Sequence, residues 1–404
     1  MHDPAKARHV VAAAYLGWTL DAFDFFIMIF AFAAVGKTFH VSGLTVTFAI
    51  TLTLAMRAIG ALIFGRLADR FGRRPILMLD IALFSVFELL TGFSWSMTSF
   101  LLFRALYGVA MGGEWGLGAS LTMESIPSEW RGWVSGLLQA GYPSGYLLAT
   151  ILYGVLFPLI GWRGMFMVGA LPALLILYIR STIPESPDWQ AQNKSRANRV
   201  PLSVVLGQHA RLAVYAVILM TAFNFFSHGT QDLYPIAFLQ EQMKFSHATV
   251  VSIAIAYNIA AILGGLAFGW LSQRIGRRVA IVIAALLALP VIPLWAFSTT
   301  PLMFGLGAVL MQFMVQGAWG VVPVHLNELS PPQIRATFPG FVYQLGNFLA
   351  SANATIQVGL AGAMGHDLRW PLAGTVGVVA VIIAVMVAFG TEARNRPMGE
   401  GAPA

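Results

Sequence analysis

The chain of 404 residues contains no cysteine and little charge: 10% of its residues are Asp, Glu, Lys or Arg, against 58% hydrophobic residues. The absence of cysteine excludes disulfides and thiol chemistry. A soluble domain carries roughly 25% charged residues, so this chain lacks the charge to cover a water-facing surface. The mean hydropathy of +0.74 instead predicts a membrane protein. At about 20 apolar residues per span, the length allows about twelve helices.

The apolar segments are distributed evenly on both sides of a single polar linker. The predicted spans are residues 10–36, 44–66, 75–94, 97–121, 133–158, 161–180, 210–240, 247–271, 279–297, 302–326, 335–363 and 369–390. Pro184 and Pro187 interrupt the pattern after the sixth span, and a polar run follows them. We therefore predict an all-α membrane fold with a six-helix bundle at 1–180, a linker at 181–210 and a second six-helix bundle at 211–404.

The two halves repeat each other at a constant offset of 204 positions, which is the separation of Gly65 and Gly269. The segment 65–74 (GRLADRFGRR) corresponds to 269–278 (GWLSQRIGRR). The same offset relates Trp115 to Trp319, Glu124 to Glu328, Pro127 to Pro331, Arg131 to Arg335 and Gly136 to Gly340. Such a match without gaps predicts two copies of one unit. Two membrane halves joined by a polar linker are typical of a transporter.

Basic residues are concentrated in alternate loops, although the net charge of +7 would suggest nucleic acid in a soluble protein. Most of the 24 basic residues fall in the two tails, the central linker and the loops on the same side. The other side holds Lys37, Arg163, Lys244 and Arg369. By the positive-inside rule, we predict a multi-pass protein of the cytoplasmic (inner) membrane with both termini cytoplasmic. Its partner is then the lipid bilayer and not nucleic acid.

The repeated basic loops predict a gate on the cytoplasmic side. We expect Asp69 to pair with a basic neighbour such as Arg131 and to latch this side when the pathway faces outward; topology anchoring alone is the alternative. Because the copy has Gln273 in place of Asp69, the latch should be stronger in the first half. The predicted gating residues are Asp69, Glu124, Arg131, Glu328 and Arg335.

Several motifs resemble the Major Facilitator Superfamily over nearly the whole chain. They are the segment 65–74 with its copy, the series Arg104, Gly108, Gly112 and Gly113, and the Pro-Glu-Ser-Pro run at 184–187. The resemblance implies a secondary transporter working by alternating access. No catalytic motif and no cluster of metal ligands accompanies them, so we expect no enzyme activity, no cofactor and no metal.

Charged residues within the predicted spans must be stabilised by a partner or by water, because a charged side chain at the bilayer centre costs about 2.5–3.5 kcal/mol. They are Asp21, Asp24, Arg57, Glu88, Arg104, Glu114 and Asp232. We expect them to pair with one another or to line an aqueous cavity. Arg57 lies near mid-membrane and can bind a carboxylate through two hydrogen bonds. It is the candidate anion site, with a structural pair to Asp24 or Glu114 as the alternative.

The seventh span carries a polar stripe in which Asn224, His228 and Gln231 recur at helical spacing. Ser227 and Asp232 flank the stripe. The segment resembles the signature N-x-x-[S/T]-H-x-[S/T]-Q-D-x-x-x-T of lactate/pyruvate–proton symporters in the sialate–proton symporter group. Ile236 stands at its last position. The segments 17–24 and 343–347 look similar to the same group. The resemblance implies that Asn224, His228 and Asp232 handle substrate and proton.

The remaining roles follow from position. Asp24 corresponds to His228 under the repeat, so the two should face each other as proton acceptors. Glu114 is a further candidate for the proton. Glu88 and Asp21 are expected to be structural partners, and Arg104 to satisfy backbone carbonyls near the packed glycines. Polar groups that recur at helical spacing suit a carboxylate or hydroxyl, or bond helices together; they are Gln139, Tyr142, Tyr146, Gln312, Gln316, Gln344 and Asn347.

Together these features predict a monomeric proton-coupled importer of a small monocarboxylate such as lactate or pyruvate. The predicted substrate-binding residues are Arg57, Tyr142, Asn224, His228, Gln231, Gln344 and Asn347, and the proton-coupling residues are Asp24, Glu114, His228 and Asp232. Crowding by phenylalanines near these positions favours a small acid. The alternatives are a symporter for sialic or aromatic acids, a proton-driven drug antiporter, whose typical glycine pattern fits 136–145 poorly, and a non-transporting receptor.

Overall fold

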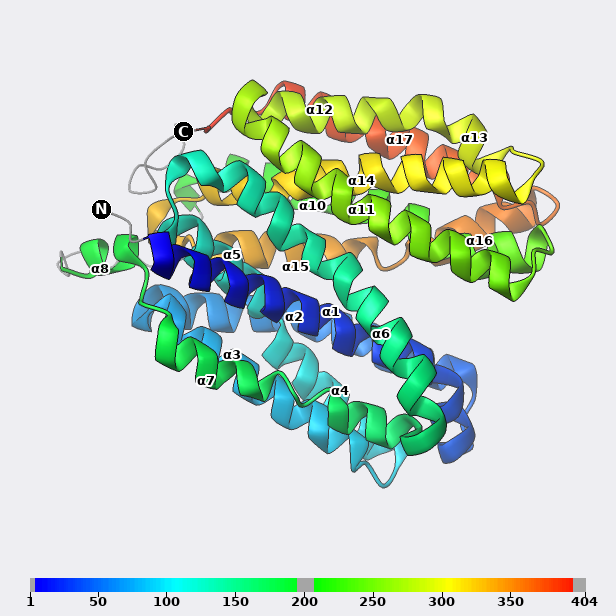
Figure 1. Ribbon diagram of the computed structural model, residues 1–404, viewed down its shortest axis with the longest axis horizontal. Helices are drawn as coiled ribbons and strands as arrows, with labels where there is room; N and C mark the ends of the chain where they lie inside the picture. The colour runs from blue at the N-terminus through cyan, green and yellow to red at the C-terminus, as the bar shows by residue number, and fades with distance from the viewer. Residues whose placement is uncertain (1–3, 195–206, 395–404) are drawn as a thin grey trace.

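The described parts of the chain are helical throughout. The computed structural model describes residues 4–194 and 207–394, which contain no β-strand. In Figure 1, most helices up to α7 lie in the lower part of the molecule and those from α10 onward in the upper part, while α6 runs from the upper left to the lower right. The first group contains α1 (Pro4–Phe39), α2 (Gly43–Phe71), α3 (Arg73–Gly92), α4 (Met97–Met111), α5 (Glu114–Ser125), α6 (Arg131–Val168) and α7 (Ala173–Thr182).

The second group is connected to the first through α8 (Pro187–Lys194) and a segment outside the described residues. It contains α10 (Ala210–Gln231), α11 (His247–Ile275), α12 (Arg277–Ala288), α13 (Ile292–Ala296), α14 (Pro301–Leu329), α15 (Thr337–Ala350), α16 (Asn353–Ala363) and α17 (Arg369–Ala388). A π-helical segment, Tyr234–Gln242, follows α10. The predicted linker 181–210 therefore includes a short helix, and part of it lies outside the described residues.

Nine helical stretches of the described chain are long and apolar enough to cross a membrane. They coincide with nine of the twelve predicted spans. The other three consist of shorter helices, with α4 and α5 covering 97–121, the end of α6 and α7 covering 161–180, and α15 and α16 covering 335–363. Gly161 turns the chain between the fifth and sixth spans with a φ of 64°, a backbone conformation that favours glycine.

The internal repeat is visible in the contacts around the basic loops. Gly72 and Gly276 have φ values of 110° and 104°. They allow the backbone to turn sharply into α3 in the first half and into α12 in the second. At the start of α3, Arg73 Nη2 lies 3.1 Å from Glu124 Oε1. In the copy, Arg277 Nε lies 3.0 Å from Glu328 Oε2. Each half therefore contains the same buried ion pair in the same place.

A carboxylate from a distant part of the chain holds the beginning of α3. Glu185 Oε1 accepts hydrogen bonds from the backbone N–H groups of Arg73 (3.0 Å) and Arg74 (3.3 Å). Burial raises the pKa of the Glu185 carboxyl, although its backbone hydrogen bonds favour the ionised form. Glu392 accepts from the backbone N–H of Arg278 in the same way at α12. The Pro-Glu-Ser-Pro run thus fastens the end of α7 to the start of α3.

Glu185→Gln should lower the free energy of unfolding by about 1 kcal/mol, because it removes a negative charge at a helix N-terminus and weakens charge-assisted hydrogen bonds. The measurement is thermal denaturation of the purified protein in detergent. Glu241→Gln, which removes an exposed carboxylate, is the matched control and should leave the melting temperature unchanged. Equal melting temperatures for the two variants would contradict the capping role.

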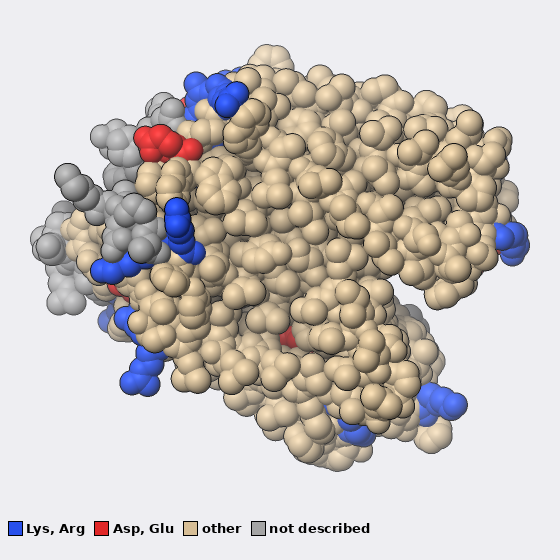
Figure 2. Space-filling model, viewed as in Figure 1, with Lys and Arg blue, Asp and Glu red and all other residues tan. Residues whose placement is uncertain are grey.

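The two groups of helices meet at the end of the molecule that carries the basic loops. Figure 2 shows Lys and Arg gathered where α1 begins, and a hollow between the two groups at the opposite end. Near the basic end, α6 and α11 approach closely through glycines: a Cβ atom added at Gly132 would lie 2.6 Å from the Gly269 carbonyl oxygen. The backbone N–H of Val324 donates to Ser135 Oγ at 3.1 Å. The halves are therefore closed together at one end and apart at the other.

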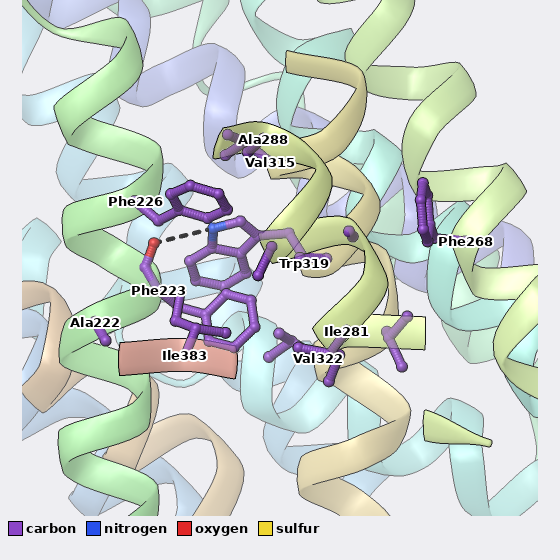
Figure 3. Close-up of a cluster of buried hydrophobic side chains, with 14 of the residues drawn as sticks. Ala222, Phe223, Phe226, Phe268, Ile281, Ala288, Val315, Trp319, Val322 and Ile383 are labelled. Carbon is purple, nitrogen blue, oxygen red and sulfur yellow. Dashed lines mark hydrogen bonds between the residues drawn. The ribbon is translucent and has the colours of Figure 1, made fainter. Parts of the chain in front are cut away.

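The core of the second group holds Trp319 in a fixed orientation. Figure 3 shows its indole lying among Phe223, Phe226 and Val322, with Nε1 donating to the Phe223 carbonyl oxygen at 3.2 Å. The Phe223 ring meets the indole edge-on, with centroids 5.3 Å apart. This packing links α14 to α10, so that both helices present fixed side chains to the space between the groups.

Candidate functional site

A small polar cavity lies between the two groups of helices, and its volume is about 30 Å³. Such a space holds about two water molecules, whereas ligand sites typically measure about 300–1,000 Å³. In this conformation the cavity is therefore narrower than a typical ligand site. The lining residues are Trp18, Asp21, Ala22, Phe25, Leu54, Arg57, Gln139, Tyr142, Asn224, Ser227, His228, Gln316, Trp319, Tyr343 and Asn347. Both halves of the chain contribute to it.

Arg57 is the cation of this cavity, and it is paired with Asp21. Its Nη2 donates to Asp21 Oδ2 at 2.9 Å, and the two side chains are 5% and 1% exposed. From the other half, the Gln344 amide oxygen accepts from Arg57 Nη2 at 3.3 Å and from Nε at 3.2 Å. The alternative considered from the sequence was a structural pair of Arg57 with Asp24 or Glu114, and the structure shows a different partner, Asp21.

The polar stripe of α10 contributes three of its five residues to the cavity. Asn224, Ser227 and His228 line it. His228 Nδ1 lies 3.1 Å from Asp232 Oδ1, and its Nε2 lies 3.1 Å from Asn347 Oδ1. Asp232 does not line the cavity, and its side chain is 41% exposed. The imidazole is thus held between a carboxylate of its own helix and an amide of α15.

Gln231, the fifth member of the stripe, turns away from the cavity. Its Nε2 donates to Gln312 Oε1 at 2.7 Å, and Gln312 Nε2 donates to Thr230 Oγ1 at 2.9 Å. This chain of bonds joins α10 to α14. In this conformation Gln231 bonds two helices together. The role predicted for it from the sequence was substrate binding.

Four of the cavity-lining residues carry a buried polar atom without a hydrogen-bond partner in the described structure. These atoms are Trp18 Nε1, Asp21 Oδ1, Gln139 Oε1 and Gln316 Oε1. A buried polar atom without a partner costs about 1–3 kcal/mol. One donor and three acceptors therefore surround the cavity, and a polar guest or water that bonds to them would recover part of that cost.

Aromatic rings form the cavity wall on the side of the basic end. Tyr343 lies between three tryptophans: its ring centroid is 4.6 Å from Trp115, 5.7 Å from Trp319 and 6.2 Å from Trp18. Tyr142 lies 6.0 Å from Trp18. This cluster joins residues of both halves beside the cavity.

Two of the predicted acids lie inside the first group of helices and do not line the cavity. Both Asp24 carboxylate oxygens are buried without a hydrogen-bond partner, and a Cβ atom added at Gly169 would lie 2.8 Å from Asp24 Oδ1. Glu114 packs against Gly17. The structure does not bring Asp24 to His228, whose ring nitrogens contact Asp232 and Asn347. The repeat relates the two positions in the sequence, but α1 is rotated so that Asp24 faces Gly169 of its own bundle.

Arg104 and Glu88 form another buried ion pair in this bundle, 2.8 Å from Nη1 to Oε2. The Arg104 guanidinium also lies 4.1 Å from the centre of the Tyr107 ring. We expected Arg104 to bond to backbone carbonyl groups. In the structure it instead contacts the Glu88 carboxylate and the Tyr107 ring.

Asp80 is a buried acid that we did not predict from the sequence. It lies in α3 with no exposed surface, and a Cβ atom added at Gly113 would lie 2.6 Å from its Oδ1. The signal was present, since Asp80 falls inside the predicted span 75–94. With Asp80, the first group of helices holds six buried acids among the described residues, namely Asp21, Asp24, Asp80, Glu88, Glu114 and Glu124.

Asp69 connects the two halves at the basic end, but not through Arg131. Its Oδ1 accepts from the backbone N–H of Ala336 at 3.0 Å, and its Oδ2 accepts from Thr337 Oγ1 at 2.5 Å. Its ion-pair partner is Arg73, 3.5 Å away at the start of α3. Asp69 thus pairs with a basic neighbour as expected, but this neighbour is Arg73 and not Arg131.

The copy of this contact follows the repeat. Gln273 Oε1 accepts from the backbone N–H of Gly132 at 3.1 Å, and Gly132 corresponds to Ala336 under the offset of 204. The other predicted gating residues lie nearby. Arg131 Nε donates to the Met123 carbonyl oxygen at 3.2 Å, and Arg335 Nη2 donates to that of Ser330 at 3.2 Å.

Comparison with known proteins decides the family. The pattern of the Major Facilitator Superfamily matches residues 14–355 and, in a second match, 217–404. The chain belongs to the Major Facilitator Superfamily. A probable 4-methylmuconolactone transporter of Cupriavidus pinatubonensis is 31% identical over 367 residues, covering 87% of this chain and 85% of the relative. The sialic acid transporter NanX of Escherichia coli is 26% identical over 364 residues, covering 89% and 88%.

A solved structure supports the same fold. The proton:xylose symporter XylE bound to 6-bromo-6-deoxy-D-glucose superposes with a TM-score of 0.76 at 18% identity, covering 99% of each chain. This chain is thus a multi-pass membrane protein with the all-α fold of Major Facilitator Superfamily transporters, a family of transporters and not of enzymes. Among the residues that the structure describes, no group of three or more His, Cys, Asp or Glu could hold a metal ion.

Proposed function

We propose that this protein is a proton-coupled symporter that imports a small monocarboxylate such as lactate or pyruvate. The observation that carries the proposal is Arg57, a buried guanidinium at the cavity between the two halves. A guanidinium binds a carboxylate through two parallel hydrogen bonds. A cation between the two halves is suited to hold an anionic substrate while the site changes its exposure from one side of the membrane to the other.

The other lining groups suit the rest of a small acid. Tyr142, Asn224, His228 and Asn347 supply donors and acceptors around Arg57, and Gln344 contacts the guanidinium directly. The unpartnered oxygens of Gln139 and Gln316 can accept from a substrate hydroxyl. The proton acceptors proposed from the sequence are Asp24, Glu114, His228 and Asp232. Of these, His228 lines the cavity.

Alternating access would operate between the bundles proposed at 1–180 and 211–404, with 181–210 as their linker. We take the basic end to be cytoplasmic, so that the conformation described is closed to the cytoplasm. Asp69, Glu124, Arg131, Glu328 and Arg335 would then hold or release this gate. The protein would act as a monomer in the cytoplasmic membrane, with both termini inside.

A planar, ring-bearing acid is the second candidate substrate. The rings of Trp18, Tyr142, Trp319 and Tyr343 surround the cavity, and aromatic faces stack well on a flat conjugated guest. Relatives named for a muconolactone and for sialic acid agree with an acid larger than lactate. The mechanism would be the same, with a wider opening of the site.

The test is uptake of labelled L-lactate into proteoliposomes that contain the purified protein, with an inward proton gradient. We expect accumulation that an ionophore abolishes and that His228→Ala reduces. Labelled nicotinate, tested in parallel, represents the ring-bearing acids. Uptake of nicotinate but not lactate would refute a small monocarboxylate as the substrate and would still agree with proton-coupled symport. Uptake that is indifferent to the gradient would refute proton coupling, and no uptake of either acid would refute the proposal.

A further inference from the structure

We propose that Asp21 takes up the proton when a substrate carboxylate binds to Arg57. This inference rests on the proposed function and names the acid that couples the two steps. Asp21 was expected from the sequence to be a structural partner only. The geometry points to a different role, because its carboxylate occupies the position on Arg57 that a substrate carboxylate would need.

Asp21 and a substrate carboxylate would compete for one guanidinium. Asp21 and Arg57 both line the cavity, and Asp21 Oδ2 holds Arg57 Nη2 at 2.9 Å. The second oxygen, Oδ1, has no hydrogen-bond partner. Asp21 therefore binds through one oxygen, while a carboxylate facing the guanidinium squarely could use two. A substrate carboxylate that bonds to Arg57 through two oxygens can displace Asp21, which bonds through one.

A bound carboxylate also changes the charge of the site. In the empty carrier, the positive Arg57 and the negative Asp21 cancel. A bound monocarboxylate adds one negative charge at the same buried position, and a buried charge without a partner is strongly unfavourable. A proton from the aqueous side that forms an O–H bond on Asp21 restores neutrality. Asp21 then no longer needs the guanidinium, and its O–H group can donate a hydrogen bond instead.

Other titratable groups also surround Asp21. Besides Arg57, those that interact with it electrostatically are Asp24, Asp80, Tyr107, Glu114, Tyr142 and Tyr343. They come from α1, α3, α4, α5, α6 and α15. All of them are acids or phenols, so none offers a counter-charge to an additional anion. Neutralisation of the loaded site therefore falls to a proton.

The other acids do not compete for Arg57 in the same way. Asp24 lies beside Gly169, outside the cavity lining. His228 and Asp232 bond to each other on the opposite half, so binding at Arg57 displaces neither. Among the acids considered for the proton, Asp21 is the one whose ion pair must open for the substrate to bind. One proton per monocarboxylate follows, which makes the loaded carrier electrically neutral.

The experiment measures proton uptake during binding. The purified full-length protein in weakly buffered detergent receives L-lactate or nicotinate, and a pH-indicator dye reports the protons taken from solution. The wild type should take up about one proton per acid bound, since binding adds one charge. Asp21→Asn should still bind the acid and exchange it across proteoliposomes, but take up no proton and lose gradient-driven accumulation.

Two further variants make the result decisive. Asp80→Asn removes another buried acid of the same bundle that lies outside the cavity, and its proton uptake should equal that of the wild type. Asp21→Glu, which keeps a carboxyl, should retain proton uptake and serves if Asp21→Asn does not fold. One proton taken up by Asp21→Asn, or a folded Asp21→Asn that binds no acid, would overturn the inference. Failure of the wild type to bind either acid would instead refute the proposed function.

Discussion

Arg57→Gln is expected to weaken monocarboxylate binding by roughly 100- to 4000-fold and to reduce uptake to background. Removing one partner of a buried, hydrogen-bonded charge pair costs about 3–5 kcal/mol, and each 1.4 kcal/mol is a factor of ten. Glutamine keeps a hydrogen-bond donor in the cavity but provides no charge. The measurement is the dissociation constant of L-lactate or nicotinate for the purified protein, together with uptake into proteoliposomes.

A double variant separates binding from folding. Arg57→Gln alone leaves the buried Asp21 without its cation, so the single variant is also expected to melt at a lower temperature. Arg57→Gln combined with Asp21→Asn replaces the ion pair by two neutral amides and should regain thermal stability without regaining binding. Arg57→Lys keeps the charge but lacks the two-pronged geometry, and its affinity should lie between. Full affinity in the double variant would show that the acid binds elsewhere.

The repeat made much of the fold and of the basic end predictable. An offset of 204 positions relates Arg73 and Glu124 to Arg277 and Glu328, and both pairs are formed. The same offset relates the contact of Asp69 with Ala336 to that of Gln273 with Gly132. A duplicated sequence predicts duplicated contacts because each copy repeats the same local geometry.

The partners of the buried charges were not predictable in the same way. Asp21 and Asp24 are three positions apart on α1 and lie on neighbouring parts of its surface. A small rotation of the helix decides which one reaches Arg57, and that rotation depends on packing against α6 and α5. The opposite side of the cavity presents the same problem, since Gln231 belongs to the polar stripe by spacing but bonds to Gln312. Spacing identifies a helix face, and tertiary packing selects the side chain that lines the site.

Gly136→Val is expected to open the basic end of the carrier and to reduce uptake at least tenfold. A Cβ atom at this position would overlap the carbonyl group of Gly265 on α11, and the Cα of Leu266 would lie 3.0 Å from it. Backbone atoms cannot move aside as a flexible side chain can, so α6 and α11 must separate. Overpacking of this kind costs about 1–3 kcal/mol or more, and that cost falls only on the conformation closed at the basic end.

The change in conformation can be measured directly, because the chain contains no cysteine. Cysteines introduced at the exposed, repeat-related positions Arg70 and Arg274 can carry spin labels on the two halves at the basic end. In Gly136→Val, the distance between the labels should shift to the longer population, while L-lactate or nicotinate binding is retained at the Arg57 site. Gly154→Val lies on the same helix with no atom within 4 Å of the added Cβ and should change neither distance nor uptake. An unchanged distance in Gly136→Val would mean that the glycine contact does not control closure. Because a carrier must close each end in turn, a protein held open at one end can bind its substrate but cannot deliver it.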